Sequence, residues 1–306
     1  MLYFRLGNEA GAAREVNVIE VNFDRRGSGS PLVLLHGIGH RWQAWRPVLD
    51  ILAERHEVFA VDMPGFGQSR DLPTGHPHDL AGSMDMLVEI FSGLGLDRPH
   101  LAGNSLGGLI AVEAAAQGLV SSTTALSPAG FWNDRDRARA LATLRIMRAG
   151  AMAPGLLRGA MVDNARLRSA TLAVLHAHPE RVDRITAAAD TDALRGSAAF
   201  IPTLRAGRRF AWTGTPPTVP VTIAWGDQDR ILPPRQAQRA ARLLPNAHHL
   251  TLTGCGHVPM IDDPEQVARV ILDTCDRAER EAPRPAAERV DATRPVAPEE
   301  SPAAAG

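Results

Sequence analysis

The chain has 306 residues, 44% hydrophobic and 22% charged, which is typical of a globular protein large enough for one sizeable core. Its net charge of −1 and pI near 6.8 exclude the basic surplus of nucleic-acid-binding proteins, and no apolar run of about 18 residues predicts a membrane span. All 33 basic residues are arginines, which excludes mechanisms that need a catalytic lysine.

The cysteines and the N-terminal residues predict a cellular compartment. Cys255 and Cys275 are the only cysteines, and they lack the C-x-x-C spacing of metal and redox motifs. The first residues contain no apolar run long enough for a signal peptide. We therefore expect two free thiols in a cytoplasmic protein.

Strand-like and helical segments alternate along the chain. Residues 16–29 alternate apolar and polar side chains, which predicts an edge strand or hairpin. Buried strands are expected over residues 31–37, 56–65, 99–105, 122–130, 219–226 and 247–256, and helices over 42–55, 79–94, 106–118, 234–244 and 264–280. This alternation predicts a parallel sheet covered on both faces, with ligands bound beyond the carboxyl ends of the strands.

One interval breaks the alternation. Residues 131–215 contain no buried strand and have amphipathic helical patterns, so they are expected to form a helical cap between core segments 1–130 and 216–281. Residues 282–306 are rich in Pro, Ala and Glu and are predicted to be disordered. Some apolar residues of the cap are expected to line a substrate pocket, and the candidates are Leu141, Leu144, Met147, Met152, Leu156, Leu157, Met161, Leu172, Leu175 and Phe200.

A serine between glycines is the candidate nucleophile. In "GNSLGG" (103–108), Ser105 lies where a predicted strand turns sharply into a predicted helix. Such a bend leaves no room for side chains two residues to either side, which accounts for Gly103 and Gly107. The helix start also directs N–H groups at the serine. On its own the pattern also describes a simple strand–helix turn.

A serine hydroxyl needs a base, an orienting carboxylate and oxyanion donors. His257 follows a predicted strand, between Gly256 and Pro259, and is the candidate base. Asp229 lies past another strand end and is the favoured acid, with neighbouring Asp227 as the alternative. The order Ser, Asp, His along the chain is the order of the α/β-hydrolase triad.

The remaining functional expectations concern the oxyanion and metals. The backbone N–H groups of Leu106 and of Ile38, in the "HGIG" turn, are the candidate oxyanion donors. The H-x-H pairs at 76/78 and 176/178 have no acidic or cysteine partners at metal spacing, so we expect solvated histidines there. No metal or cofactor is required by this chemistry.

Five motifs in this order, "LLHGIG", "VDMPGFGQS", "GNSLGG", "WGDQDRILPP" and "GCGHVP", resemble the α/β-hydrolase superfamily, in particular its capped, esterase-like branch. The resemblance covers about residues 16–280. It implies an eight-stranded, mostly parallel sheet, a helical cap after the sixth strand, and a triad of Ser105, Asp229 and His257. Oxyanion donors would be Ile38 and Leu106, and Gly65 and Gly67 would permit the tight "DMPGFGQS" loop.

Departures from other branches narrow the expected chemistry. Related dehalogenases and epoxide hydrolases use an aspartate nucleophile where this chain has Ser105, and the cap tyrosines of epoxide hydrolases are absent because Tyr3 is the only tyrosine. We therefore expect a serine hydrolase that cleaves an ester or thioester of a small, largely apolar molecule. Carbon–carbon hydrolysis of a diketone and slow-turnover small-molecule reception remain alternatives.

Overall fold

A seven-stranded sheet forms the centre of the protein in the computed structural model, which describes residue 19 and residues 21–281. The strand order is β1-β3-β2-β4-β5-β6-β7, and every neighbouring pair is parallel except β1 and β3. The bounds are β1 (Phe23–Arg26), β2 (Ser30–Leu35), β3 (His56–Val61), β4 (His100–Asn104), β5 (Ser122–Leu126), β6 (Val221–Gly226) and β7 (His248–Leu252).

Among the described residues the sheet has seven strands, one fewer than the eight that the resemblance implied. Within the segment expected over residues 16–29, Phe23–Arg26 form β1. Residues 1–18 and 20 lie outside the described residues, as does the predicted disordered tail at 282–306. The other six predicted strands are confirmed, each within a few residues of its expected bounds.

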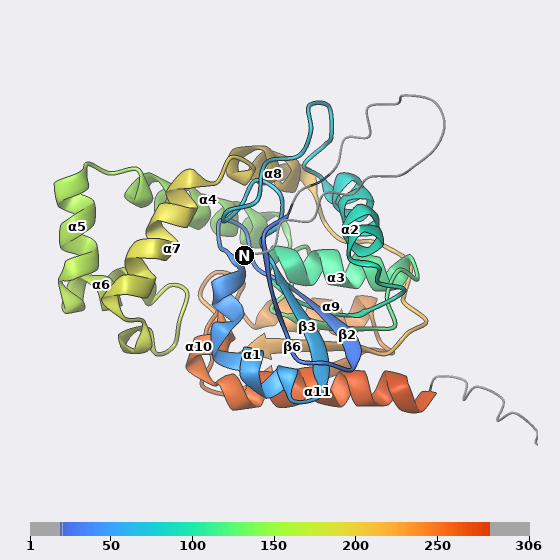
Figure 1. The fold of residues 1–306 in the computed structure, drawn as a ribbon. Helices are drawn as coiled ribbons and strands as arrows, with labels where there is room; N and C mark the ends of the chain where they lie inside the picture. The colour runs from blue at the N-terminus through green and yellow to red at the C-terminus, as the bar shows by residue number, and fades with distance from the viewer. Residues whose placement is uncertain (1–18, 20, 282–306) are drawn as a thin grey trace, which may run out of the picture.

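The central strands are buried because both faces of the sheet are covered. Every residue of β4, β5 and β6 is buried, as expected for parallel strands with helices on both sides. One face packs against α1 (Arg46–Ala53), α10 (Pro259–Asp262) and α11 (Pro264–Glu281), and the other against α2 (Leu80–Leu94), α3 (Leu106–Ala116) and α9 (Arg235–Leu243). Figure 1 shows α11 running along one side of the sheet and α2 and α3 on the other.

Local signals in the sequence set where helices start and stop. The Asp79 carboxylate accepts a hydrogen bond of 3.0 Å from the Gly82 N–H and caps the start of α2. The same helix ends at Gly95, whose φ of 68° is the left-handed conformation that glycine adopts without strain. These signals explain why the predicted bounds of α2 match so closely.

Helices alone fill the chain between β5 and β6. They are α4 (Asp134–Ala151), α5 (Gly155–Asp163), α6 (Ala165–Leu172), α7 (Arg184–Gly196) and α8 (Phe200–Ala206), with short 3₁₀ turns at Pro179–Arg181 and Gly207–Arg209. They extend to one side of the sheet (Figure 1). The buried Asp136 of α4 forms ion pairs with Arg235 and Arg239 of α9, the latter at 2.6 Å, and so joins these helices to the core.

Within residue 19 and residues 21–281, no helix combines the length and apolar character that crossing a membrane requires.

Candidate active site

Ser105 occupies a strained bend between β4 and α3. Its φ of 56° and ψ of −112° lie outside the usual regions for a residue with a side chain. Such strain persists only where the surroundings impose it, and it concentrates at functional sites. Ser105 is mostly buried, and its backbone N–H donates to the Leu126 carbonyl at 3.0 Å.

The glycines around Ser105 are required by close backbone contacts. A Cβ atom at Gly103 would lie 2.1 Å from the Gly107 carbonyl oxygen, and one at Gly107 would lie 2.3 Å from the Leu35 carbonyl oxygen. Gly108 has more room, since its Cβ would lie 3.1 Å from the nearest atoms. The tight turn thus brings the first turn of α3 against the end of β2.

His257 and Asp229 form a buried pair. The His257 Nδ1 lies 2.7 Å from Asp229 Oδ2, and both side chains are almost wholly buried. The other carboxylate oxygen accepts hydrogen bonds from the Ile231 N–H at 2.9 Å and the Leu232 N–H at 2.7 Å. Asp227 is exposed and accepts from the Gly254 N–H, so the carboxylate in contact with His257 is that of Asp229.

Asn104 is a buried contact of this site that the sequence did not reveal. Its Nδ2 donates to the His257 carbonyl at 2.8 Å and to the Leu126 carbonyl at 3.1 Å. The residue beside Ser105 therefore fixes the backbone of the loop that carries His257. The position next to the serine was visible in the sequence, but its distant partner was not.

Ile38 and Leu106 flank Ser105 from two elements. Leu106 is the first residue of α3, and the first N–H groups of a helix have no partner within it. Ile38 lies in the turn after β2, where the His40 N–H donates to the Gly37 carbonyl at 3.1 Å. Both residues line a pocket that Ser105 also lines.

His36 holds that turn in place. Its Nδ1–H donates to the Gly37 carbonyl at 2.7 Å, and its Nε2 accepts from the Met63 N–H at 3.1 Å. Complete burial lowers the pKa of His36 to about 4. The neutral imidazole thus links the turn that carries Ile38 to the loop that follows β3.

This histidine should make stability depend on pH. The folded protein keeps His36 neutral down to about pH 4, whereas an unfolded chain takes up the proton near pH 6.5. The free energy of unfolding is therefore retained above pH 6.5 and falls as the pH drops toward 4, by about 2 kcal/mol at pH 5. Urea denaturation of the parent and of His36→Gln at pH 7 and pH 5 measures this difference.

A matched control for the pH experiment is His178→Gln, which removes an imidazole whose side chain is 41% exposed. We expect the parent and this control to lose the same stability between pH 7 and pH 5, and His36→Gln to lose less. An unchanged loss in His36→Gln would contradict the assignment.

Two pockets, each enclosing about 100 Å³, meet at Ser105. The first is almost wholly apolar, and its walls include Leu109, Trp132, Leu141 and Phe210. The second contains His257 and the polar residues His40, His176 and Asp190. Residues that line both pockets are Ile38, Ser105, Leu144 and Ile231.

The apolar residues predicted for the substrate pocket divide into three groups. Leu141 and Leu144 line the first pocket, and Leu144, Met147, Leu172, Leu175 and Phe200 line the second. Met161 lines a separate pocket between α4, α5, α6 and α7. Met152, Leu156 and Leu157 are exposed, so the expectation does not hold for them.

His176 corrects the expectation that the H-x-H histidines are solvated. It is only 4% exposed, and burial lowers its pKa to about 4. The Val258 N–H donates to the Leu175 carbonyl at 3.0 Å, and the Asp262 carboxylate accepts from the Ala177 N–H at 3.0 Å. These contacts bury the segment against the His257 loop, which no local sequence pattern could indicate.

Comparison with known proteins decides the family. A family model described as "Alpha/beta hydrolase family" matches residues 32–270. The chain belongs to this family. The protein is therefore a hydrolase, and its mostly parallel sheet flanked by helices is the α/β-hydrolase fold.

Relatives of this hydrolase include enzymes with different substrates. An uncharacterized protein of Mycobacterium tuberculosis is 31% identical over 83% of this chain and 78% of its own length. A pimeloyl-[acyl-carrier protein] methyl ester esterase of Nitrosomonas europaea is 26% identical over 80% and 96%. A 2-hydroxy-6-oxo-6-(2'-aminophenyl)hexa-2,4-dienoic acid hydrolase of Metapseudomonas resinovorans is 26% identical over 85% and 88%.

Among solved structures, a bacterial membrane phospholipase A superposes on this hydrolase with a TM-score of 0.66. It is 26% identical and covers 86% of this chain and 84% of its own.

Proposed function

We propose that this hydrolase cleaves an ester or thioester of a small, largely apolar substrate through the triad Ser105, His257 and Asp229. The observation that carries the proposal is the buried His257–Asp229 pair beside a serine held at positive φ, with both Ser105 and His257 lining one pocket. This is the arrangement that activates a hydroxyl for acyl transfer.

The reaction has two halves. Ser105 Oγ attacks the carbonyl carbon while His257 Nε2 takes its proton, and Asp229 stabilises the imidazolium through Nδ1–H. The N–H groups of Ile38 and Leu106 donate to the oxyanion. His257 then protonates the leaving alcohol or thiol, giving an acyl-enzyme. A water molecule activated by His257 attacks the acyl group, releases the acid and returns the proton to Ser105.

The lining of the pockets supports an uncharged substrate. Among the described residues, no arginine lines either pocket at Ser105, and the first pocket is walled by apolar side chains. A buried carboxylate without a cationic partner is strongly unfavourable. We assign the acyl group to the first pocket and the leaving group to the second, where His40, His176 and Asp190 offer polar contacts.

The helices α4–α8 act as the cap in this proposal, with residues 131–215 as a specificity unit between core segments 1–130 and 216–281. Leu141 and Leu144 of α4 and Leu172 of α6 supply pocket walls, which supports that role. The two buried, unpaired cysteines fit the reducing cytoplasm in which we expect the enzyme to work.

Carbon–carbon hydrolysis of a diketone is the second candidate. The likeness to the Metapseudomonas resinovorans hydrolase favours it. That relative's named substrate is an acid, however, and among the described residues no arginine lines either pocket to pair with its carboxylate. Turnover of a panel of neutral esters, thioesters, lactones and dienoic acids distinguishes ester hydrolysis from carbon–carbon hydrolysis. Faster turnover of the dienoic acids would contradict the ester proposal. Ligand binding without turnover would favour a receptor instead.

Replacing the acid of the triad tests its role. Asp229→Asn should lower kcat by about 10⁴-fold, because an amide stabilises the wrong imidazole tautomer. Asp227→Asn is the matched control, since its carboxylate is exposed and bonds the Gly254 N–H. Steady-state kinetics with p-nitrophenyl acetate measure both. Equal losses in the two variants would contradict the assignment.

A further inference from the structure

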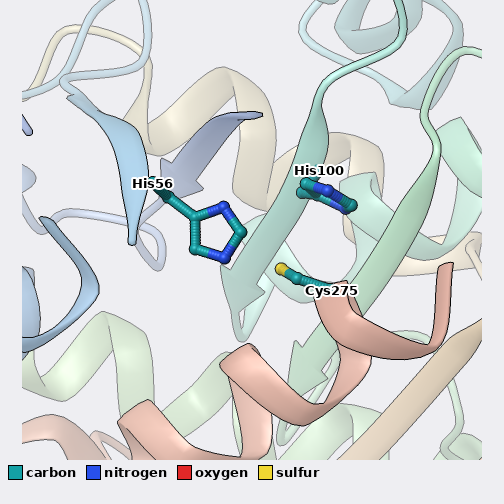
Figure 2. A group of neighbouring side chains, drawn as sticks. All are labelled: His56, His100 and Cys275. Atoms are coloured by element: carbon teal, nitrogen blue, oxygen red, sulfur yellow. The ribbon is translucent and has the colours of Figure 1, made fainter. Parts of the chain in front are cut away.

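A cluster of metal-binding side chains lies at the end of the sheet opposite to Ser105. His56 and His100 are the first residues of β3 and β4, whereas Ser105 follows the last residue of β4. Cys275 lies on α11, which packs against the sheet face that α1 and α10 also cover. One ligand atom from each of the three buried residues lies within 4.8 Å of the others, and Figure 2 shows them gathered between the strand ends and α11.

From this cluster we infer that the protein binds one Zn²⁺ ion through His56, His100, Cys275 and Glu279. The inference is independent of the proposed hydrolytic function. Cysteine and histidine are the preferred zinc ligands, and a tetrahedral ion with bonds of about 2.0–2.3 Å holds ligand atoms about 3.3–3.6 Å apart. Small side-chain rotations therefore suffice to close the cluster around the ion.

His56 carries the strongest sign of a missing ligand. It is 1% exposed, and its Nε2 is buried without a hydrogen-bond partner. The opposite ring atom, Nδ1, lies 3.1 Å from the Ser30 carbonyl oxygen, which can only accept. Nδ1 also lies 2.9 Å from the Ser30 hydroxyl, whose single proton is donated to Glu279. Both neighbours of Nδ1 are therefore acceptors, so Nδ1 carries the proton and Nε2 presents a bare lone pair. Metal-bound histidines in proteins have this arrangement.

His100 has a polar neighbour at each of its ring nitrogens. Its Nδ1 lies 2.8 Å from the Ser122 hydroxyl, and its Nε2 lies 3.5 Å from a carboxylate oxygen of Glu279. Because the carboxylate can only accept, Nε2–H faces it in the metal-free protein, while Nδ1 accepts from the Ser122 hydroxyl. A shift of the ring proton to Nδ1, where the Ser122 oxygen can accept it, frees the Nε2 lone pair for an ion. A cation between Nε2 and the carboxylate satisfies both groups.

Glu279 lies beside this group of three, with a carboxylate oxygen 3.5 Å from His100 Nε2, and a rotation of its side chain would supply the fourth ligand. It lies four residues after Cys275, so both side chains project from one face of α11. Its carboxylate also accepts a hydrogen bond from the Ser30 hydroxyl at 2.5 Å. Because the Glu279 side chain is 44% exposed, the ion has a route from solvent.

The charges balance when zinc binds. The Cys275 thiol is only 1% exposed in the metal-free protein. Zn²⁺ replaces the thiol proton, which passes to solvent, and the thiolate and the Glu279 carboxylate together neutralise the ion. The site joins the starts of β3 and β4 to the C-terminal helix α11, and its role is to stabilise the fold.

The test uses the full chain stripped of metal with a chelator. Zinc titration in competition with a chromophoric chelator should give one equivalent bound, and cobalt should give a thiolate charge-transfer band with tetrahedral d–d bands. Cys275→Ser should weaken zinc binding more than about 100-fold, since removing partners of the ligands alone costs 10–100-fold. Cys255→Ser is the matched control, because Cys255 is also a buried free cysteine.

If Cys275→Ser does not fold, Glu279→Gln tests the proposal instead. The Glu279 side chain is partly exposed, so we expect this variant to fold. It should weaken zinc binding about tenfold or more and remove the increase in Tm that zinc gives the parent. Absence of zinc binding by the parent, or equal affinity in Cys275→Ser or Glu279→Gln and the parent, would overturn the proposal. A cobalt spectrum without a thiolate band would do the same.

Discussion

Ser105→Ala should lower kcat for short-chain p-nitrophenyl esters by at least about 10³-fold. The variant keeps the backbone of the bend, the His257–Asp229 pair and both pockets, and lacks only the attacking oxygen. No acyl-enzyme can then form, so the residual rate comes from water attack assisted by the oxyanion donors. Stopped-assay kinetics at high enzyme concentration, with a check of Tm, measure this loss.

Ser127→Ala is the matched control for that experiment. Ser127 is also a buried serine at positive φ (43°) after a strand end, and its hydroxyl accepts from the Gly226 N–H at 3.3 Å. It lines neither pocket at Ser105. We expect its kcat to stay within tenfold of the parent. Retention of parental activity by Ser105→Ala would remove Ser105 from the reaction.

Gly107→Ala should lower both the stability and the activity of the protein. The added Cβ would lie 2.3 Å from the Leu35 carbonyl oxygen and 2.7 Å from that of His36, so either α3 or the end of β2 must move. Forced overpacking of backbone costs about 3 kcal/mol of unfolding free energy. Displacing the oxyanion donors by about 1 Å should also lower kcat by about 100-fold.

Two other glycines calibrate this prediction. Gly108→Ala meets its nearest atoms at 3.1 Å and should be milder, while Gly150→Ala in α4 meets nothing within 4 Å and should be neutral or stabilising by up to about 1 kcal/mol. Urea denaturation of the three variants measures their free energies of unfolding, which should rise from Gly107→Ala to Gly108→Ala to Gly150→Ala. If Gly107→Ala were as stable and active as Gly150→Ala, the steric account of the bend would be wrong.

The sequence predicted those parts of the fold and site that depend on local pattern. Buried strands closed by glycine, capped helices such as α2, and the glycines around Ser105 are encoded within a few residues each. Asp229 and His257 could be named because each follows a strand end, and parallel strands present these ends at one edge of the sheet. The 2.7 Å contact between them then distinguished Asp229 from Asp227.

Features that depend on contacts between distant segments could not be predicted. His176 is buried because Leu175 and Ala177 bond to the chain beyond His257. Asn104 reaches a carbonyl 153 residues away. The zinc ligands come from two strand starts and the last helix, so no spacing along the chain reveals them. Each of these three features arises only when elements that are far apart in the sequence pack together.

The identity of the nucleophile is tested most directly by covalent labelling. A fluorophosphonate should react with the native protein by losing fluoride to attack from Ser105 Oγ, adding one phosphonyl group per chain. Peptide mass spectrometry should find that group on Ser105, and prior incubation with a p-nitrophenyl ester should slow its formation. A label on another residue, or none on a natively folded chain that hydrolyses esters, would contradict the account.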